Sequence, residues 1–349
     1  MANIQDVAQR AGVSASTVSN VINGRTGQMR QDTLARIQAA IAELGYRPNR
    51  AAQQLKTGQT SILGLLVPSI VNPSFAALAR AVDVAAQDGH GYRVLLGNTY
   101  RQKEKEETFF EDLLSHGVKG VIVVSAQVEL EHFRTAISRG LVMMNYDGRT
   151  NVRQPSDGML IDSVSMNNFE AGRIAARHLI ENGCQRIAFV TESGRTISRQ
   201  DKIEGFLSIV SEAGATTVGS VIEGKALSDY GDSEMAELGK SLAETISAMD
   251  VRPDGIVAIN DMLAIGMLAG FRSRGVKIPE DISIVGIDDM FLSALVTPAI
   301  TSVSPPIAAM AKVMVDRLIS RFSDPTIPVE EFLFAPTLVA RESVARHRH

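Results

Sequence analysis

A chain of 349 residues is long enough for two or three domains, and 45% hydrophobic with 21% charged residues is typical of a globular protein. No apolar run reaches the roughly 18 residues that a membrane span needs, and the start MANIQDVAQRAG lacks the apolar core of a signal peptide, so we expect a cytoplasmic protein without a membrane partner. A single cysteine, Cys184, excludes an internal disulfide and a cysteine-rich zinc site.

Charge is distributed unevenly along the chain. Residues 1–58 carry seven cations and three anions, a net charge of +4, and the total of −4 therefore leaves −8 for the remaining residues. We call residues 1–58 the head and the remaining residues the body. A basic head on an acidic body is typical of a protein whose head binds phosphates while its body is repelled from them.

The first two elements form a helical pair. Apolar residues recur at helical spacing from Ile4 to Ala11, and Asn3 is a good N-cap for them. Gly12 breaks this pattern, and Ser14 can cap a second short helix, ASTVSNVIN. A helix of about eight residues, a tight turn with glycine and a second short helix together predict a helix-turn-helix arrangement.

A third helix is expected over about residues 31–44, where it ends before Gly45. Its apolar side can close a small core with the first two helices, which are too small to bury enough surface alone. That apolar side consists of Leu34, Ile37, Ile41 and Leu44.

Beyond this core, Asn49 can cap a short helix, RAAQQLK, that ends at Thr57 and Gly58. It has about two turns and one large apolar residue, Leu55. An isolated helix of this length is not stable in water.

From Ser61 onward, short runs rich in Val and Ile alternate with longer amphipathic segments. The expected strands are 62–67, 92–97, 120–124, 141–145, 186–191, 255–260 and 282–288. The expected helices are 73–89, 103–116, 129–138, 169–182, 202–213, 233–249, 262–274 and 307–322. Unbroken apolar strands separated by crossover helices predict parallel sheets covered on both faces, and the pattern runs twice.

Motifs of the common enzyme classes are missing from the sequence. It contains no GxxxxGK[ST], no GxGxxG after a strand, no HExxH and no GxSxG. We therefore expect no enzyme, no catalytic residues, no cofactor and no metal site.

The run IQDVAQRAGVSASTVSNVING followed by LGYRPNRAAQQL resembles the headpiece of the lactose-repressor (LacI/GalR) family. The body resembles the effector domain of that family, which is similar to periplasmic sugar-binding proteins. The segments that carry this second resemblance are IVNPSFAAL, NNFEAGRIAARHLIENGCQRIAFV, NDMLAIGMLAGFRSRGVKIPEDISIVGIDD and TPAITSVSPP.

The resemblance implies an all-α helix-turn-helix headpiece with a hinge helix, joined to an α/β body like a periplasmic binding protein with two doubly wound parallel-sheet lobes. Residues 1–46 would bind DNA, 47–58 would form the hinge helix, and 61–349 would bind the effector and dimerise. The first lobe would comprise about 61–160 plus 303–332, and the second about 163–302 plus 333–349. In the family a serine often caps the third helix, so Arg30 at that place predicts a weak cap.

For DNA, the resemblance implies that the second helix lies in the major groove with Ala15, Ser16 and Asn20 toward the bases. Asn20 can pair with adenine through two hydrogen bonds. The hinge helix, begun by Asn49, would wedge Leu55 into the minor groove. Residues expected to contact phosphates are Ser14, Thr17, Asn23 and Arg25.

For the effector, the resemblance places Ser74 and Phe75 at the start of a helix that faces the cleft between the lobes. Tyr146 and Asp147 follow a strand and either contact the ligand or simply end that strand. Lys202 stands where arginine is usual, and Arg199 can substitute for it.

Three further positions lie at strand ends in the second lobe. Asp288 is predicted to accept hydrogen bonds from the ligand, whereas Asn260 and Asp261 either do the same or cap the following helix. The resulting expectation is a homodimeric repressor that binds double-stranded operator DNA under the control of a small molecule, a sugar or sugar derivative. A corepressor of purine type, or a phosphocarrier protein, is the alternative.

Overall fold

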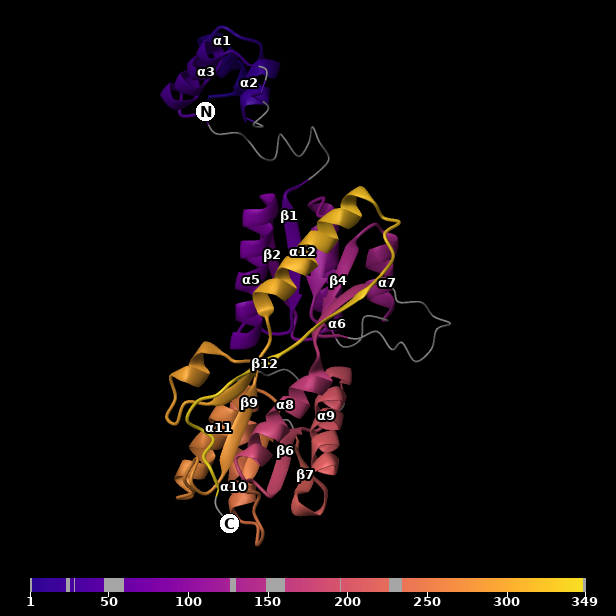
Figure 1. The fold of residues 1–349 in the computed structure, drawn as a ribbon. Helices are drawn as coiled ribbons and strands as arrows, with labels where there is room; N and C mark the ends of the chain where they lie inside the picture. Colours follow the sequence, from indigo (N-terminus) through magenta and orange to yellow (C-terminus); the bar gives the residue numbers. More distant parts are fainter. Residues whose placement is uncertain are drawn as a thin grey trace. The chain divides into compact units, whose positions relative to one another are not determined.

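The computed structural model describes residues 2–22, 26–27, 29–46, 60–125, 130–148, 161–194, 196–225 and 234–347. The chain divides into two compact units, Met1–Thr60 and Ser61–His349. Figure 1 shows the elements of each unit.

The first unit holds the three predicted helices, α1 (Ile4–Ala11), α2 (Ala15–Ile22) and α3 (Gln31–Glu43). Asn3 caps α1 as predicted, because its side chain accepts hydrogen bonds from the backbone N–H groups of Gln5 and Asp6 while the Asp6 carboxylate accepts from the N–H of Asn3. The predicted weak cap of α3 is confirmed, since Arg30 makes no side-chain capping bond. The small core consists of Val7, Ala8, Ala11, Val18, Ile37 and Ala40.

The second unit contains two six-stranded sheets. The first has the order β11-β5-β4-β3-β1-β2 and consists of β1 (Ile62–Val67), β2 (Arg93–Asn98), β3 (Gly120–Val123), β4 (Val142–Tyr146), β5 (Asp162–Met166) and β11 (Glu331–Phe334). The second has the order β12-β10-β9-β8-β6-β7 and consists of β6 (Arg186–Glu192), β7 (Val218–Gly224), β8 (Gly255–Ala258), β9 (Ser283–Ile287), β10 (Thr301–Ser304) and β12 (Thr337–Val339). The pairings are parallel except for β12, which runs antiparallel to β10.

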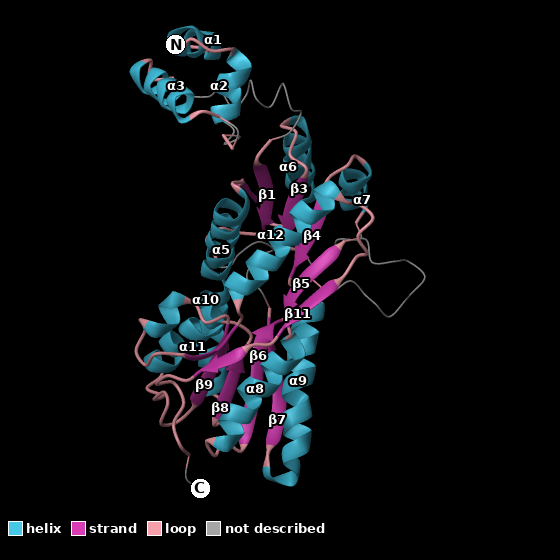
Figure 2. Ribbon diagram, turned by 45° about the horizontal axis from the view of Figure 1, so that its top comes forward, coloured by secondary structure: helices cyan, strands magenta, loops and turns pink. Residues whose placement is uncertain are grey.

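Helices cover both faces of each sheet, as the sequence predicts (Figure 2). The helices of the first sheet are α5 (Pro73–His90), α6 (Lys103–Ser115), α7 (Glu131–Ser138) and α12 (Ile307–Ser323). Those of the second are α8 (Asn168–Glu181), α9 (Ile197–Ala213), α10 (Glu234–Ser247) and α11 (Asp261–Ser273). Within the described ranges, no helix combines the length and apolar character that crossing a membrane requires.

The boundary between the lobes differs from the prediction. The predicted division at residues 160–163 would give the segment after it to the second lobe, yet β5 pairs with β4 and β11 in the first sheet. The chain thus first crosses after Met166, returns between Ser304 and Ile307, and crosses again between β11 and β12. The sequence DSVSM conceals β5 because its two serines are polar although both are fully buried.

Two glycines let α8 and α9 touch backbone to backbone. A Cβ atom on Gly172 would lie 2.0 Å from the carbonyl oxygen of Lys202, and one on Gly205 would lie 1.9 Å from that of Phe169. This approach brings the N-terminal halves of both helices together. The helix α9 also begins five residues before the predicted start at Lys202, because the Thr196 side chain caps it by accepting from the N–H of Arg199.

Candidate DNA-reading helix and effector site

The helix α2 presents a small polar face. Ser16 and Asn20, one turn apart, are exposed, whereas Val18 on the opposite side is fully buried. Ala15 is half-buried and packs against the headpiece core. Less of its methyl group is therefore exposed to a base edge than the prediction of a groove-facing residue implies.

Three hydroxyl groups gather at the start of α2. The hydroxyl oxygen of Ser14 lies 2.7 Å from that of Ser16 and 2.8 Å from that of Thr17, and it also accepts from the N–H of Thr17 at 3.2 Å. Hydroxyls and helix N–H groups at a helix start are suited to phosphate oxygens. The other predicted DNA contacts, Asn23, Arg25, Asn49 and Leu55, lie outside the described residues.

In the first lobe, Tyr146 and Asp147 end β4. Asp147 adopts a left-handed φ of 55°, and its carboxylate accepts from the hydroxyl of Ser165 at 3.1 Å and from the amide of Asn168 at 2.9 Å. Tyr146 is 8% exposed, and its pKa is raised well above the usual value, first by burial and then by the negative charges of Asp147 and Asp288. Because Asp288 follows β9, its influence on Tyr146 shows that the carboxyl ends of strands from both sheets lie near one another.

Sequence reasoning missed Ser165 and Asn168, which hold the Asp147 carboxylate, and it also missed Asn145. The Asn145 amide donates to the carbonyl oxygens of Ser125 and Gly148 and ties together the ends of β3 and β4. The one feature of the sequence that could have pointed to these residues is the pair of adjacent asparagines at 167–168, just after a polar segment.

The start of α5 is organised by a cap. Asn72 accepts from the N–H of Ser74 at 2.9 Å, and Phe75 is half-buried against the hydrophobic core. Ser74 and Phe75 therefore lie in the first turn of α5, which follows β1, as the sequence predicts.

The two predicted cations of α9 have different surroundings. Arg199 pairs with the Glu192 carboxylate and donates to the Gly194 carbonyl oxygen. Lys202 is 7% exposed, and its ammonium has no hydrogen-bond or ion-pair partner within the described part of the chain. Arg199 is thus already engaged, whereas no such pairing holds Lys202 among the described residues.

The three strand-end residues of the second lobe separate into different positions. Asn260 caps α11 by accepting from the N–H of Leu263 at 2.9 Å, in line with the capping alternative. Asp288 is partly exposed, with a left-handed φ of 108°. Asp261 differs from both expectations. It is fully buried, and both its oxygens accept hydrogen bonds from other parts of the second lobe. It therefore neither caps α11 nor presents its carboxylate at the surface.

Comparisons with known proteins place these features in a family. Residues 3–49 match the family described as bacterial regulatory proteins, lacI family, and residues 176–344 match the periplasmic binding protein-like domain. The HTH-type transcriptional regulator GalS of Salmonella typhimurium is 34% identical, over 99% of this chain and 97% of that protein. The chain belongs to the lacI family. The HTH-type transcriptional repressor PurR of Edwardsiella ictaluri is 32% identical over the same shares of the two chains.

Solved structures confirm the predicted fold of this lacI-family member. The lac repressor dimer bound to operator and the anti-inducer ONPF has a TM-score of 0.79 at 24% identity, over 99% of each chain. A periplasmic binding protein/LacI transcriptional regulator of Alkaliphilus metalliredigens complexed with D-xylulofuranose has a TM-score of 0.67 at 26% identity, over 82% of this chain and 99% of that one. Family membership makes the protein a DNA-binding transcription regulator, as predicted.

Proposed function

We propose that this regulator is a homodimeric repressor whose operator affinity is controlled by a small carbohydrate-like effector bound between the two sheets. The observation that carries the proposal is that Asp288, at the carboxyl end of β9, lies close enough to Tyr146, at the carboxyl end of β4, for its charge to raise the pKa of Tyr146. Ligands of doubly wound sheets bind at such ends. Carboxylates accept hydrogen bonds only, and sugar hydroxyls donate them.

Lys202 supplies the complementary chemistry. The Lys202 side chain is 7% exposed, and its ammonium has no partner within the described residues, so a ligand that brings oxygen acceptors to it can form charge-assisted hydrogen bonds. Asp147 and Asp288 would accept from the hydroxyls of the effector, while Lys202 would donate to its oxygens. The regulator complexed with D-xylulofuranose supports a sugar as the effector class.

The experiment that tests the effector site begins with a thermal-shift screen of sugars, sugar phosphates and nucleobases on the full chain. With the compound that gives the largest shift, we expect Asp288→Ala to lose at least tenfold in its binding affinity, about 1.4 kcal/mol, while operator affinity without effector stays within twofold. Asp281→Ala, an exposed carboxylate in the same lobe, is the control. Unchanged binding by Asp288→Ala would remove Asp288 from the site.

A corepressor mechanism is the second candidate, because similarity to a repressor, PurR, does not tell whether the effector weakens or strengthens operator binding. The sign of control decides between the two. An effector that weakens operator binding identifies an inducer, and one that strengthens it identifies a corepressor.

Base reading by α2 leads to a separate prediction. Operator sites selected from random duplex DNA with the wild-type chain should show an adenine preference that Asn20→Ala loses, with about 1–3 kcal/mol less discrimination at one base pair per half-site. Gln38→Ala, at an exposed position on α3, should select the same sites as the wild type. An unchanged preference in Asn20→Ala would exclude Asn20 as a base contact.

A further inference from the structure

The turn after β9 is held by three consecutive backbone N–H groups. The N–H of Asp288 donates to the carbonyl oxygen of Val303 at 2.9 Å, and that of Asp289 donates to the hydroxyl of Ser302 at 3.0 Å. The N–H of Met290 donates to the carboxylate of Asp261 at 2.9 Å. The turn is therefore fixed to β10 and to the first residue of α11.

These bonds hold a backbone that would not otherwise persist. Asp288 and Asp289 have φ values of 108° and 49°, a region that residues with side chains rarely adopt. Such a conformation is strained and persists only where the surrounding structure determines it. Arg341 adds one constraint, because its guanidinium donates to the Asp289 carboxylate at 2.6 Å.

Asp261 connects these constraints. One of its oxygens accepts from the Ser302 hydroxyl at 2.6 Å, and the other accepts from the Ser293 hydroxyl at 2.6 Å in addition to the N–H of Met290. Since the Ser302 hydroxyl also accepts from Asp289, a single buried carboxylate supports two of the three N–H groups directly or through one hydroxyl.

The neighbouring strand leaves space for this carboxylate. A Cβ atom on Gly286 would lie 2.1 Å from an oxygen of Asp261, so any other residue there would displace it. The carboxylate is thus built into the second lobe at the point where the turn begins.

Exposed or partly exposed side chains lie on the turn both before and after Met290, whose N–H bonds to the Asp261 carboxylate. Asp288, at the start of the turn, is the proposed effector contact and acts electrostatically on Tyr146 of the first lobe. Phe291 and Leu295, after Met290, are 70% and 72% exposed. A change at Asp261 would therefore move the effector contact and an exposed apolar pair together.

We propose that the ionised carboxylate of Asp261 is a positioning group that sets the direction of Asp288, so that the conformation of this turn follows the protonation of Asp261. The inference rests on the proposed role of Asp288 in effector binding. It assigns to Asp261 a role without ligand contact, in which one buried proton controls the shape of the effector site.

Burial places this proton in an accessible range of pH. It raises the pKa of Asp261 to about 6, against the opposing effect of the hydrogen bonds from Ser293, Ser302 and Met290, while the charge of Asp289 raises it further. Above this pH the ionised carboxylate accepts all three bonds. Below it, the neutral carboxyl accepts these bonds more weakly and gains an O–H donor, although the three groups that bond to it are themselves donors. Asp289 is the charged residue that acts on the carboxylate, and Arg341 is paired with Asp289.

The chain contains no tryptophan, so Phe291→Trp provides a single indole on the turn. With the full-length chain and no effector present, we expect the indole emission to change with a midpoint near pH 6. Adding Asp261→Asn, which keeps the shape but not the titration, should abolish that transition. Because no effector is used, failure of this test is distinguishable from failure of the proposed effector site.

Two further variants make the result specific. Asp289→Asn should keep the transition and lower its midpoint, since the charge of Asp289 raises the pKa of Asp261. Ser302→Ala should raise the midpoint, because it removes a donor that favours the ionised form, and it carries the test if Asp261→Asn does not fold. Absence of the transition in the parent, its survival in Asp261→Asn, or an unchanged midpoint in Ser302→Ala would overturn the proposal.

Discussion

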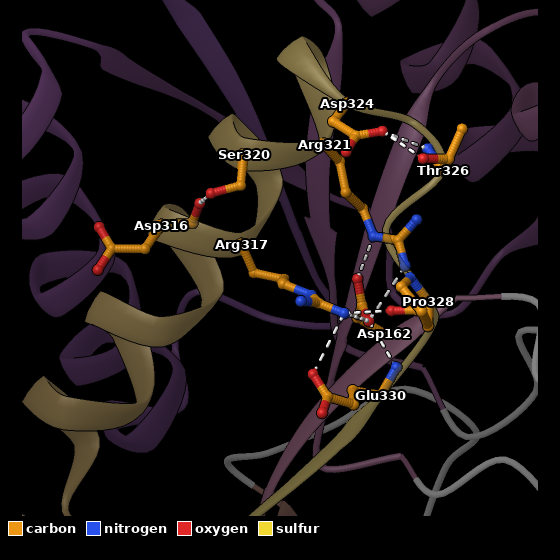
Figure 3. A network of polar contacts seen from close by, with 9 residues as sticks. All are labelled: Asp162, Asp316, Arg317, Ser320, Arg321, Asp324, Thr326, Pro328 and Glu330. Carbon is orange, nitrogen blue, oxygen red and sulfur yellow. Dashed lines mark hydrogen bonds and ion pairs between the residues drawn. The ribbon is translucent and has the colours of Figure 1, made fainter.

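Asp162→Ala is expected to lower the free energy of unfolding of the second unit by about 3–5 kcal/mol, the loss typical when one partner of a buried ion pair is removed. Asp162 begins β5 with a fully buried carboxylate that contacts the guanidinium groups of Arg317 and Arg321 from α12 (Figure 3). The N–H of Glu330 also donates to it, at 2.7 Å. Alanine would leave both arginines, 16% and 12% exposed, without this carboxylate.

Urea unfolding followed by circular dichroism measures this loss. The matched control is Asp324→Ala, which removes an exposed carboxylate just after α12 that bonds only to Thr326 among the contacts of Figure 3. We expect the control to change the unfolding free energy by less than about 1 kcal/mol. Equal effects of the two substitutions would show that the network around Asp162 does not stabilise the fold.

This network also shows where prediction from the sequence ends. The strands rich in Val and Ile and the helices between them were predicted within a few residues, because burial on both faces of a parallel sheet imposes an apolar run. The strand β5 was missed because its polar side chains are buried by partners that are distant in sequence: Arg317 and Arg321 lie more than 150 residues from Asp162. No local pattern records such a pairing.

The candidate effector site divides in a similar way. Strand-end residues such as Tyr146 and Asp288 were predictable from their place after apolar runs and from the family resemblance. The buried position of Asp261 was not, because it depends on Gly286, Ser293 and Ser302 from three other segments. Asn260 and Asp261 are adjacent in sequence, yet only the folded lobe distinguishes a helix cap from a buried anchor.

Gly205→Ala should destabilise the second unit by about 3 kcal/mol, the upper end of what an extra methyl group costs in a closely packed interior. A Cβ atom at this position would lie 1.9 Å from the carbonyl oxygen of Phe169 and 2.9 Å from its carbonyl carbon, and these backbone atoms cannot rotate away. The helices α8 and α9 must therefore separate. Because Lys202 precedes Gly205 by one turn, the same separation should also weaken effector binding.

Gly89→Ala is the matched control for this substitution, since Gly89 lies in α5 with no atom within 4 Å of an added Cβ. Alanine there removes backbone freedom from the unfolded chain and should stabilise by about 0.4–1 kcal/mol. Urea midpoints of the two variants should thus shift in opposite directions from the wild type. A Gly205→Ala midpoint at or above that of the wild type would mean that the two helices are not in backbone contact, and the position assigned to Lys202 would fall with it.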